Sequence, residues 1–335
     1  YSADGQAFAG GIAGRNIEGL ITLCSATGEV KAESSRASSA NEGRADAGGI
    51  AGSNIGSTIS YSYADGAVTA SATGNNNSNA RAGGIAGHNA ADTGAGFPVR
   101  SAALITDCYS TGDVTATEGK KEARAGGIAG QNVSNQSARA ATVRRCYSTG
   151  NISASGSGQS VRAGGIIGVN SGDTGPGGEA GSVIVEYCYA AGNIEATTSS
   201  YCNVGGIAGL NFGLNGKVQY SAALNRQITN SGGGGFTVQR IAQNDQSVLN
   251  KNIAWNGMKL NGVTVSGGGQ DFYGGKDGKS TTTAELTEGH TVWEDLFGAS
   301  NFGIGSGKPW KWVEGYPYPA LQWQTSVPSV PTLEP

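Results

Sequence analysis

The sequence is poor in charge and in long apolar runs. Only 14% of its 335 residues are charged, and the net charge is −3. A weakly acidic chain of this kind lacks the basic surface that binds nucleic acid or an anionic membrane. No apolar run approaches the ~20 residues that a membrane-spanning helix requires. We therefore expect no nucleic-acid partner and no membrane insertion.

Histidine is too scarce to support most metal or nucleophile chemistry. The chain has two, His88 and His290, and neither lies in the H-E-x-x-H pattern of a metallopeptidase helix. A Ser-His-Asp triad would need one of them, and neither has a supporting motif. We expect His88 on an exposed turn. The sequence thus predicts no catalytic residue, no metal and no cofactor in this chain, so that any catalytic centre lies outside it.

Glycine, by contrast, is abundant and is concentrated in a repeated phrase. There are 58 glycines, and one phrase recurs six times, as FAGGIAGRN, DAGGIAGSN, RAGGIAGHN, RAGGIAGQN, RAGGIIGVN and NVGGIAGLN. The phrase has neither the G-x-G-x-x-G pattern nor the Lys-Ser/Thr of a phosphate-binding loop. Its glycines instead suit tight turns and the close approach of neighbouring chain segments. We interpret it as the unit of a repeat array.

A second phrase follows each of the first five copies. It reads LITLCSATGEV, TISYSYADGAV, LITDCYSTGDV, TVRRCYSTGNI and IVEYCYAAGNI, and a degenerate sixth copy reads VQYSAALNRQI. Aliphatic and small residues recur at fixed offsets within it, as a narrow interior requires. Because one repeat cannot bury its apolar face alone, the repeats must stack. The prediction is an all-β parallel β-solenoid (β-helix) of about six coils, one repeat forming one coil. Two short coils per repeat remain an alternative.

Two sets of residues belong to the predicted interior or its corners. The asparagine that closes each glycine phrase could hydrogen-bond its equivalent in the next coil, forming a ladder of Asn16, Asn54, Asn89, Asn132, Asn170 and Asn211. Four of the five cysteines, Cys24, Cys108, Cys146 and Cys188, share one repeat position, and Cys202 has another interior register. Neighbouring side chains would run parallel, which suits disulfide geometry poorly. We expect five buried thiols, with a disulfide between coils as the alternative.

These residues resemble the GLUG motif, which pairs a G-G-L-V-G-x-N phrase with an I-x-x-x-Y-A-T-G-x-V phrase. Here Ile128 and Ala129 replace Leu-Val, and the second phrase contains Cys108-Tyr109-Ser110-Thr111-Gly112. The resemblance covers about residues 1–230. It implies a β-helical part of a large secreted or cell-surface bacterial protein, as in adhesins and IgA-specific metallopeptidases. The region ending in WKWVEGYPYPALQW is similar to the terminal region that often follows such arrays.

The composition divides the chain into three parts. Residues 1–230 are the expected solenoid, which begins in the middle of a coil, so that the chain is expected to be a fragment of a longer protein. Residues 231–324 contain all five tryptophans and are the expected C-terminal cap, with aromatic side chains closing the end of the stack. A tryptophan-lined sugar site around Trp310, Trp312, Tyr316 and Tyr318 is the alternative. A short helix, interrupted at Gly289, is expected from about Thr283. Residues 325–335 are rich in proline and are expected to be a linker.

Two further ladders are predicted on the outer surface. Tyr63, Tyr109, Tyr147 and Tyr189 share a register that points outward, and Arg81, Arg124 and Arg162 share another, with Asp46 one coil before Arg81. Stacking that stabilises the sheet is the default interpretation. The tyrosines could also form a flat strip for glycan or protein contact. Because like-charged arginines in adjacent coils repel one another, a carboxylate or sulfated ligand is conceivable at the second ladder.

Three functions remain open at this point. The first is a non-enzymatic extracellular module for adhesion or display on the bacterial cell surface, a monomer within a longer chain that contacts a host glycan or an extracellular protein. The second is a structural stalk of a larger secreted peptidase. The third is a carbohydrate-active β-helix enzyme, which would need a pair of acidic residues on one face. Asp107, Asp113 and Glu186 are candidates by position only.

Overall fold

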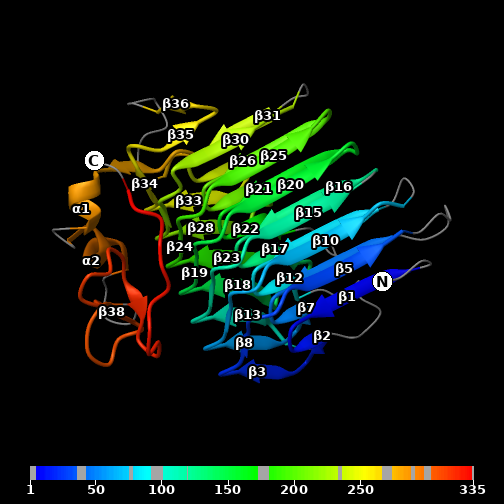
Figure 1. The fold of residues 1–335 in the computed structure, drawn as a ribbon, viewed down its shortest axis with the longest axis horizontal. Coiled ribbons are helices and arrows are strands. Elements are labelled where there is room, and N and C mark those ends of the chain that lie inside the picture. Colours follow the sequence, from blue (N-terminus) through cyan, green and yellow to red (C-terminus); the bar gives the residue numbers. More distant parts are fainter. Residues whose placement is uncertain are drawn as a thin grey trace.

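The computed structural model describes residues 5–35, 43–74, 78–91, 101–118, 120–172, 181–232, 236–265, 274–287, 291–297 and 303–333. Over these residues the chain forms the expected all-β parallel solenoid, in which successive coils stack on one another (Figure 1). Each coil contributes one strand to each of five sheets, and the second coil, for example, consists of β6 to β10. One sequence repeat therefore forms one coil. Seven coils are present in the described residues, one more than expected.

The first and second sheets are built from the two sides of the glycine phrase. The first sheet contains β1 (Gln6–Gly10), β6 (Arg44–Gly48), β11 (Asn79–Gly83), β16 (Glu122–Gly126), β21 (Ser160–Gly164), β26 (Tyr201–Gly205) and β31 (Phe236–Gln239). The second contains β2 (Ala13–Ile17), β7 (Ala51–Ile55), β12 (Ala86–Ala91), β17 (Ala129–Ser134), β22 (Ile167–Gly172), β27 (Ala208–Phe212) and β32 (Ala242–Asp245).

The second phrase forms the other three sheets. The third sheet contains β3 (Leu20–Thr22), β8 (Thr58–Ser60), β13 (Ala103–Thr106), β18 (Ala140–Arg144), β23 (Ser182–Glu186), β28 (Gly216–Gln219) and β33 (Val248–Asn250). The fourth contains β4 (Ser25–Ala26), β9 (Tyr63–Ala64), β14 (Tyr109–Ser110), β19 (Tyr147–Ser148), β24 (Tyr189–Ala190), β29 (Ala222–Ala223), β34 (Ile253–Trp255) and β37 (Lys279–Thr281). The fifth contains β5 (Val30–Ser34), β10 (Val68–Ala72), β15 (Val114–Glu118), β20 (Ile152–Gly156), β25 (Ile194–Thr198), β30 (Gln227–Asn230), β35 (Lys259–Leu260) and β36 (Val263–Thr264).

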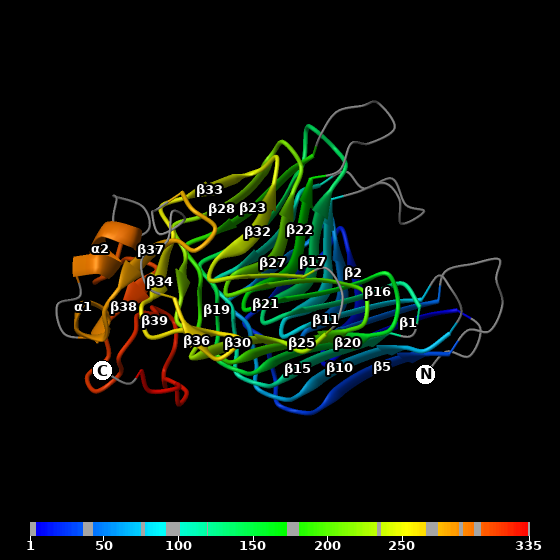
Figure 2. The same ribbon diagram turned by 90° about the horizontal axis from the view of Figure 1, so that it is seen from above.

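The coil folds into two arms, which diverge in Figure 2. The fifth and first sheets pack on each other in one arm, where the facing residues are small, such as Ala70 and Ala80. The second and third sheets pack in the other arm, around Ala91, Ala103, Ala141 and Val183. Small residues recur at these positions because the two sheets of each arm pack closely face to face. The isoleucine of each glycine phrase, such as Ile128, is fully buried in the main core.

The asparagine ladder is confirmed. The side-chain amide of each asparagine donates to the side-chain oxygen of the next, from Asn16 through Asn54, Asn89, Asn132, Asn170 and Asn211, at 2.8–2.9 Å. The ladder also extends one coil further, to Asn244, at 3.0 Å. Because the side chains from Asn16 to Asn211 are buried, these bonds satisfy polar groups that water cannot reach.

The cysteine position lies at the corner between the third and fourth sheets. The preceding residue has a left-handed backbone, with φ of 56° at Asp107 and 48° at Arg145, and the same holds for Leu23, Tyr61, Tyr187, Tyr220 and Lys251. Inside the corner, Cys146 Sγ donates to Arg144 O at 3.1 Å. All five cysteines are free thiols, and four are buried, whereas Cys24 in the first coil is partly exposed. The expectation of five buried thiols is therefore corrected for Cys24.

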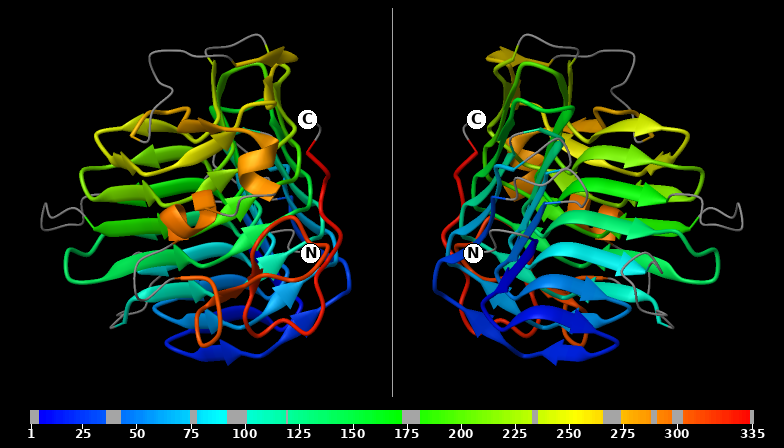
Figure 3. Two further views of the ribbon diagram at one scale, coloured as in Figure 1. Left: turned by 90° about the vertical axis from the view of Figure 1, so that its left-hand side faces the viewer. Right: turned by 90° about the vertical axis from the view of Figure 1, so that its right-hand side faces the viewer.

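The residues after 230 correct the expected boundary and the expected end cap. Strands β31 to β35 form a seventh coil, and β37 adds a further strand to the fourth sheet. The two short helices, α1 (Thr283–Thr287) and α2 (Thr291–Phe297), and the pair β38 (Trp310–Lys311) and β39 (Ala320–Leu321) then run back along the side of the stack (Figures 1 and 3). The split helix is confirmed. No helix in the described part of the chain is long and apolar enough to cross a membrane.

Candidate ligand-binding sites

The four predicted tyrosines form a continuous stack on the fourth sheet. The ring centroids of Tyr63 and Tyr109, of Tyr109 and Tyr147, and of Tyr147 and Tyr189 are 4.9, 5.0 and 4.8 Å apart. Their planes differ by only 2–3°. This geometry follows from the in-register pairing of β9, β14, β19 and β24. The predicted stacking of these residues is therefore confirmed.

The tyrosine stack is nevertheless not a free binding surface, which corrects one of our expectations. Tyr109 is 8% exposed, and Tyr147 and Tyr189 are fully buried. The C-terminal region covers them, because Trp323 packs against Tyr109 and Trp310 against Tyr189. Gln324 Nε2 also donates to the Tyr147 hydroxyl at 2.6 Å. The tyrosine stack thus packs against the C-terminal region of the same chain.

The alternative sugar site in the C-terminal region is also corrected. Trp310 and Tyr318 are fully buried, and Trp312 packs against the core. Tyr316 and Tyr318 line a pocket of about 510 Å³ together with the proline-rich tail, but neither tryptophan lines it. The tail, expected to be a linker, packs on the protein, where the Tyr318 hydroxyl donates to Pro331 O at 3.3 Å. The aromatic side chains therefore pack the C-terminal region onto the solenoid.

Alkaline pH should loosen this covered stack. Burial, followed by the neighbouring Tyr63, raises the pKa of Tyr109 to about 12, against about 10 in an unfolded chain. The stability that Tyr109 contributes is complete below pH ~10 and is lost as the pH rises towards 12, because only the unfolded chain ionises readily in that interval. We expect the midpoint of urea unfolding to fall steeply between pH 10 and 11.5, and less steeply in Tyr109→Phe. Equal slopes in both proteins would contradict the prediction.

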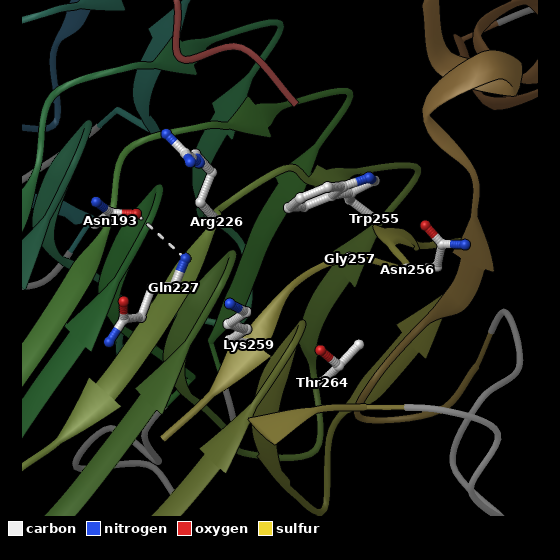
Figure 4. Close-up of a pocket in the computed structure, with 8 residues that line it drawn as sticks. All are labelled: Asn193, Arg226, Gln227, Trp255, Asn256, Gly257, Lys259 and Thr264. Atoms are coloured by element: carbon white, nitrogen blue, oxygen red, sulfur yellow. Dashed lines mark hydrogen bonds between the residues drawn. The ribbon is translucent and has the colours of Figure 1, made fainter. Parts of the chain in front are cut away.

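An open pocket of about 610 Å³ lies near the C-terminal end of the stack, at the corner between the fourth and fifth sheets. Figure 4 shows its lining, which consists of Asn193, Arg226, Gln227, Trp255, Asn256, Gly257, Lys259 and Thr264. The three corner residues that face it come from successive coils, since Asn193, Gln227 and Lys259 are neighbours in register. We name this the Trp255 pocket. Sequence patterns do not indicate this pocket, because all of its residues except Asn193 come from the degenerate repeats after Asn211.

The walls of the Trp255 pocket are fixed by hydrogen bonds. Trp255 Nε1 donates to Thr283 Oγ1 at 3.0 Å, which sets the orientation of the indole. Gly257 lies against the ring, where a Cβ atom would come within 2.2 Å of it. Asn193 Oδ1 accepts from the backbone amide of Gln227 at 3.2 Å (Figure 4). Among the described residues, the lining thus combines the apolar edge of Trp255, several amides and two cations, Arg226 and Lys259, without Asp or Glu.

The predicted arginine register is also confirmed, and the structure enlarges it. Arg81 pairs in register with Arg124, and Arg124 with Arg162. Arg15 on the second sheet and Arg44 on the first lie close to the same set, since both guanidinium groups lie over the ring of Phe8. We name Arg15, Arg44, Arg81, Arg124 and Arg162 the arginine ladder. His88 faces it from β12 and is 4% exposed, so the expectation of an exposed turn was wrong. His290 lies outside the described residues.

The three acidic candidates are each engaged in separate contacts. Asp107 accepts from Arg145 Nε at 2.7 Å, and Asp113 accepts from the backbone amide of Asn151 at 2.8 Å. Glu186 accepts from Gln219 Nε2 at 2.8 Å. These bonds hold the chain at the corners and edges of neighbouring coils. Across the described residues, no group of three or more His, Cys, Asp or Glu side chains could hold a metal ion.

Stacked parallel sheets of this kind define the chain as a parallel β-solenoid. The family model of the GLUG motif matches residues 78–115, which include most of the third coil, so the chain carries the GLUG motif that the sequence resembles. The fold is similar to the crystal structure of a candidate immunoglobulin A1 protease from Bacteroides ovatus, with 20% sequence identity and a TM-score of 0.51. The match covers 91% of this chain and 75% of that one. Among curated proteins, none matches the chain.

Proposed function

We propose that this chain is a non-enzymatic extracellular module of a bacterial cell-surface or secreted protein, and that it acts in adhesion or display by binding a host glycan. The GLUG motif and the similarity to the Bacteroides ovatus protein support an extracellular bacterial setting. The Trp255 pocket supports glycan binding and is the observation that carries the proposal. Within the protein, the tyrosine stack is already covered, which leaves this pocket as a better candidate for ligand contact.

The lining of the Trp255 pocket has the chemistry that sugar recognition requires. Trp255 is 5% exposed, so its indole gives the pocket a small apolar edge, and amides such as those of Asn193 and Asn256 can donate to and accept from sugar hydroxyl groups. Arg226 and Lys259 give the lining two cationic groups, which favour a sugar that carries a carboxylate.

The stalk of a larger secreted peptidase is the second candidate. It is favoured by the similar Bacteroides ovatus structure, a candidate immunoglobulin A1 protease, of which the match covers 75%. A stalk requires length and rigidity but no ligand, and the stacked coils with their asparagine ladder provide both. The two candidates differ in one property that can be measured, which is the binding of a ligand by the isolated chain.

A glycan array with the purified chain tests the proposal. We expect the chain to bind glycans that end in an acidic sugar. In calorimetry with the best glycan, Arg226→Gln and Lys259→Gln should each weaken binding by about tenfold or more, as expected for the loss of a hydrogen bond from a charged donor. Lys31→Gln, in the first coil and far along the stack, should bind as the wild type does. If no glycan binds, or if both pocket variants bind normally, the proposal fails and the stalk is favoured.

A further inference from the structure

A second pocket, of about 350 Å³, adjoins the Trp255 pocket on the outer face of the fifth sheet. The two pockets share Asn193 and Gln227, which lie side by side in Figure 4. The other lining residues of the second pocket lie in β20, β25 and β30 or directly before them, and these strands belong to successive coils (Figure 1). We name the second pocket the fifth-sheet groove. Together the two pockets span four coils, from Asn151 to Lys259.

One side of the groove is lined by amide side chains that hydrogen bonds hold in place. Asn151 Oδ1 accepts from the backbone amide of Asn193 at 3.1 Å, just as Asn193 Oδ1 accepts from that of Gln227 at 3.2 Å. In the preceding coil, Asp113 Oδ1 accepts from the backbone amide of Asn151 at 2.8 Å. Because the oxygen of Asn193 is held in this way and the residue is exposed, its Nδ2 group can donate to a hydroxyl group of a ligand.

The floor of the groove carries hydroxyl groups and one carboxylate. Ser153, Glu195 and Thr229 are neighbours in register on β20, β25 and β30. They alternate with buried residues such as Ile194, so their side chains point away from the core. Gln227 Nε2 donates to Thr229 Oγ1 at 2.9 Å, which joins the floor to the row of amides. Since hydroxyl groups can both donate and accept, this floor suits the hydroxyl groups of a neutral sugar.

The two pockets differ in the sign of their charged side chains. Arg226 and Lys259 line the Trp255 pocket. Glu195 is exposed and is the one charged side chain among the described residues that line the groove. A ligand that is acidic along its whole length would place a negative charge beside Glu195 and lose affinity. A ligand that is acidic at one end only would match both pockets.

We propose that the fifth-sheet groove continues the glycan site, so that the ligand is an oligosaccharide with one acidic sugar at its end. The acidic sugar lies in the Trp255 pocket, and neutral sugars extend from it along the stack, past Gln227 and Asn193 towards Ser153. Four coils correspond to three strand spacings, or roughly 14 Å, and about three sugar rings cover that length. The inference rests on the proposed function and narrows it to one class of glycan, a neutral chain with a single acidic end.

Calorimetry of the full chain with four defined sugars tests the inference. N-acetylneuraminic acid is an acidic sugar alone, and sialyllactose is the same sugar with two neutral sugars attached. Galacturonic acid is a second acidic sugar alone, and in trigalacturonic acid every sugar is acidic. We expect sialyllactose to bind about tenfold or more tightly than N-acetylneuraminic acid, as additional hydrogen bonds in the groove would give. Trigalacturonic acid should gain less than about threefold over galacturonic acid, because Glu195 repels its further carboxylates.

Three variants test the groove separately from the pocket. Ser153→Tyr fills the far end of the groove with a side chain that strands tolerate well. It should lower the affinity for sialyllactose to that for N-acetylneuraminic acid and leave the binding of the monosaccharide unchanged. Thr69→Tyr is the matched control, because Thr69 occupies the same row of the fifth sheet two coils earlier and does not line the groove. Glu195→Gln should raise the gain of trigalacturonic acid to about tenfold and leave the affinity for sialyllactose unchanged.

The outcomes distinguish a failure of this inference from a failure of the proposed function. If the acidic monosaccharides bind but sialyllactose binds no more tightly than N-acetylneuraminic acid, the groove is not a glycan site and the pocket still is. Equal binding of sialyllactose by Ser153→Tyr and Thr69→Tyr would overturn the inference in the same way. An unchanged gain of trigalacturonic acid in Glu195→Gln would overturn the restriction to a single acidic end. If none of the four sugars binds, the inference and the proposed function both fail.

Discussion

Gly126→Ala should unfold the middle of the solenoid. A Cβ atom at this position would lie 2.0 Å from Ala129 O and 2.7 Å from Gly168 N, and both are backbone atoms that cannot move aside without breaking the coil. Gly48, Gly83 and Gly164 have the same 2.0 Å contact in their own coils. The glycine phrase is therefore a steric requirement of the turn between the first and second sheets. We expect a loss of more than about 4 kcal/mol in the free energy of unfolding.

Gly28→Ala is the matched control for this prediction. Gly28 also lies in a turn of the repeat, but a Cβ atom there would meet nothing within 4 Å. Its substitution should change the free energy of unfolding by less than about 0.5 kcal/mol. Both variants are compared by urea unfolding followed by circular dichroism. A Gly126→Ala protein as stable as Gly28→Ala would show that the packing of the coils is looser than described.

Asn132→Ala should lower the free energy of unfolding by about 3–5 kcal/mol, because it interrupts the buried asparagine ladder in its middle. Asn132 Nδ2 donates to Asn170 Oδ1 at 2.8 Å and to Ala141 O at 2.9 Å. Its own side-chain oxygen accepts from Asn89 Nδ2 at 2.8 Å. Alanine removes all three bonds and leaves their partners buried without water. The free energy of unfolding, measured by urea titration, should fall accordingly.

Asn16→Ala tests whether the cost comes from position in the ladder. Asn16 is at the first coil of the chain, where its side chain donates one ladder bond, to Asn54 Oδ1 at 2.9 Å. Losing one such bond near the end of the stack should cost about 1 kcal/mol. An equal loss in the free energy of unfolding for Asn16→Ala and Asn132→Ala would show that the number of ladder bonds removed does not determine the effect.

The repeat itself was predictable from the sequence, because each structural requirement recurs in every coil. The same residue types recur at the same structural positions in successive coils. These are the small residues at fixed offsets, the closing asparagine and the tyrosine of the fourth sheet. The sequence pattern no longer predicted the coil where the repeat loses its characteristic residues. Asn244 continues the ladder, but the glycine pair of its phrase is replaced by Gln239 and Arg240, so the seventh coil was assigned to a separate region.

The covering of the tyrosine stack could not be predicted from the repeat. The contact between Gln324 and Tyr147 joins residues 177 positions apart, and the C-terminal region contains no internal repeat that would indicate its partner. The role of His88 was missed for a related reason. Its register was predicted, but the sheet that faces it follows from how the coil folds into two arms. Arg44 was missed likewise, since it occupies a different register from Arg81.

The most direct test of the central claim is a crystal structure of the chain with the glycan that binds best on the array. We predict a sugar ring in the Trp255 pocket, with its hydroxyl groups bonded to the amides of Asn193 and Asn256 and its acidic group near Arg226 and Lys259. A sugar bound on another face of the solenoid, with the Trp255 pocket containing only water, would contradict it.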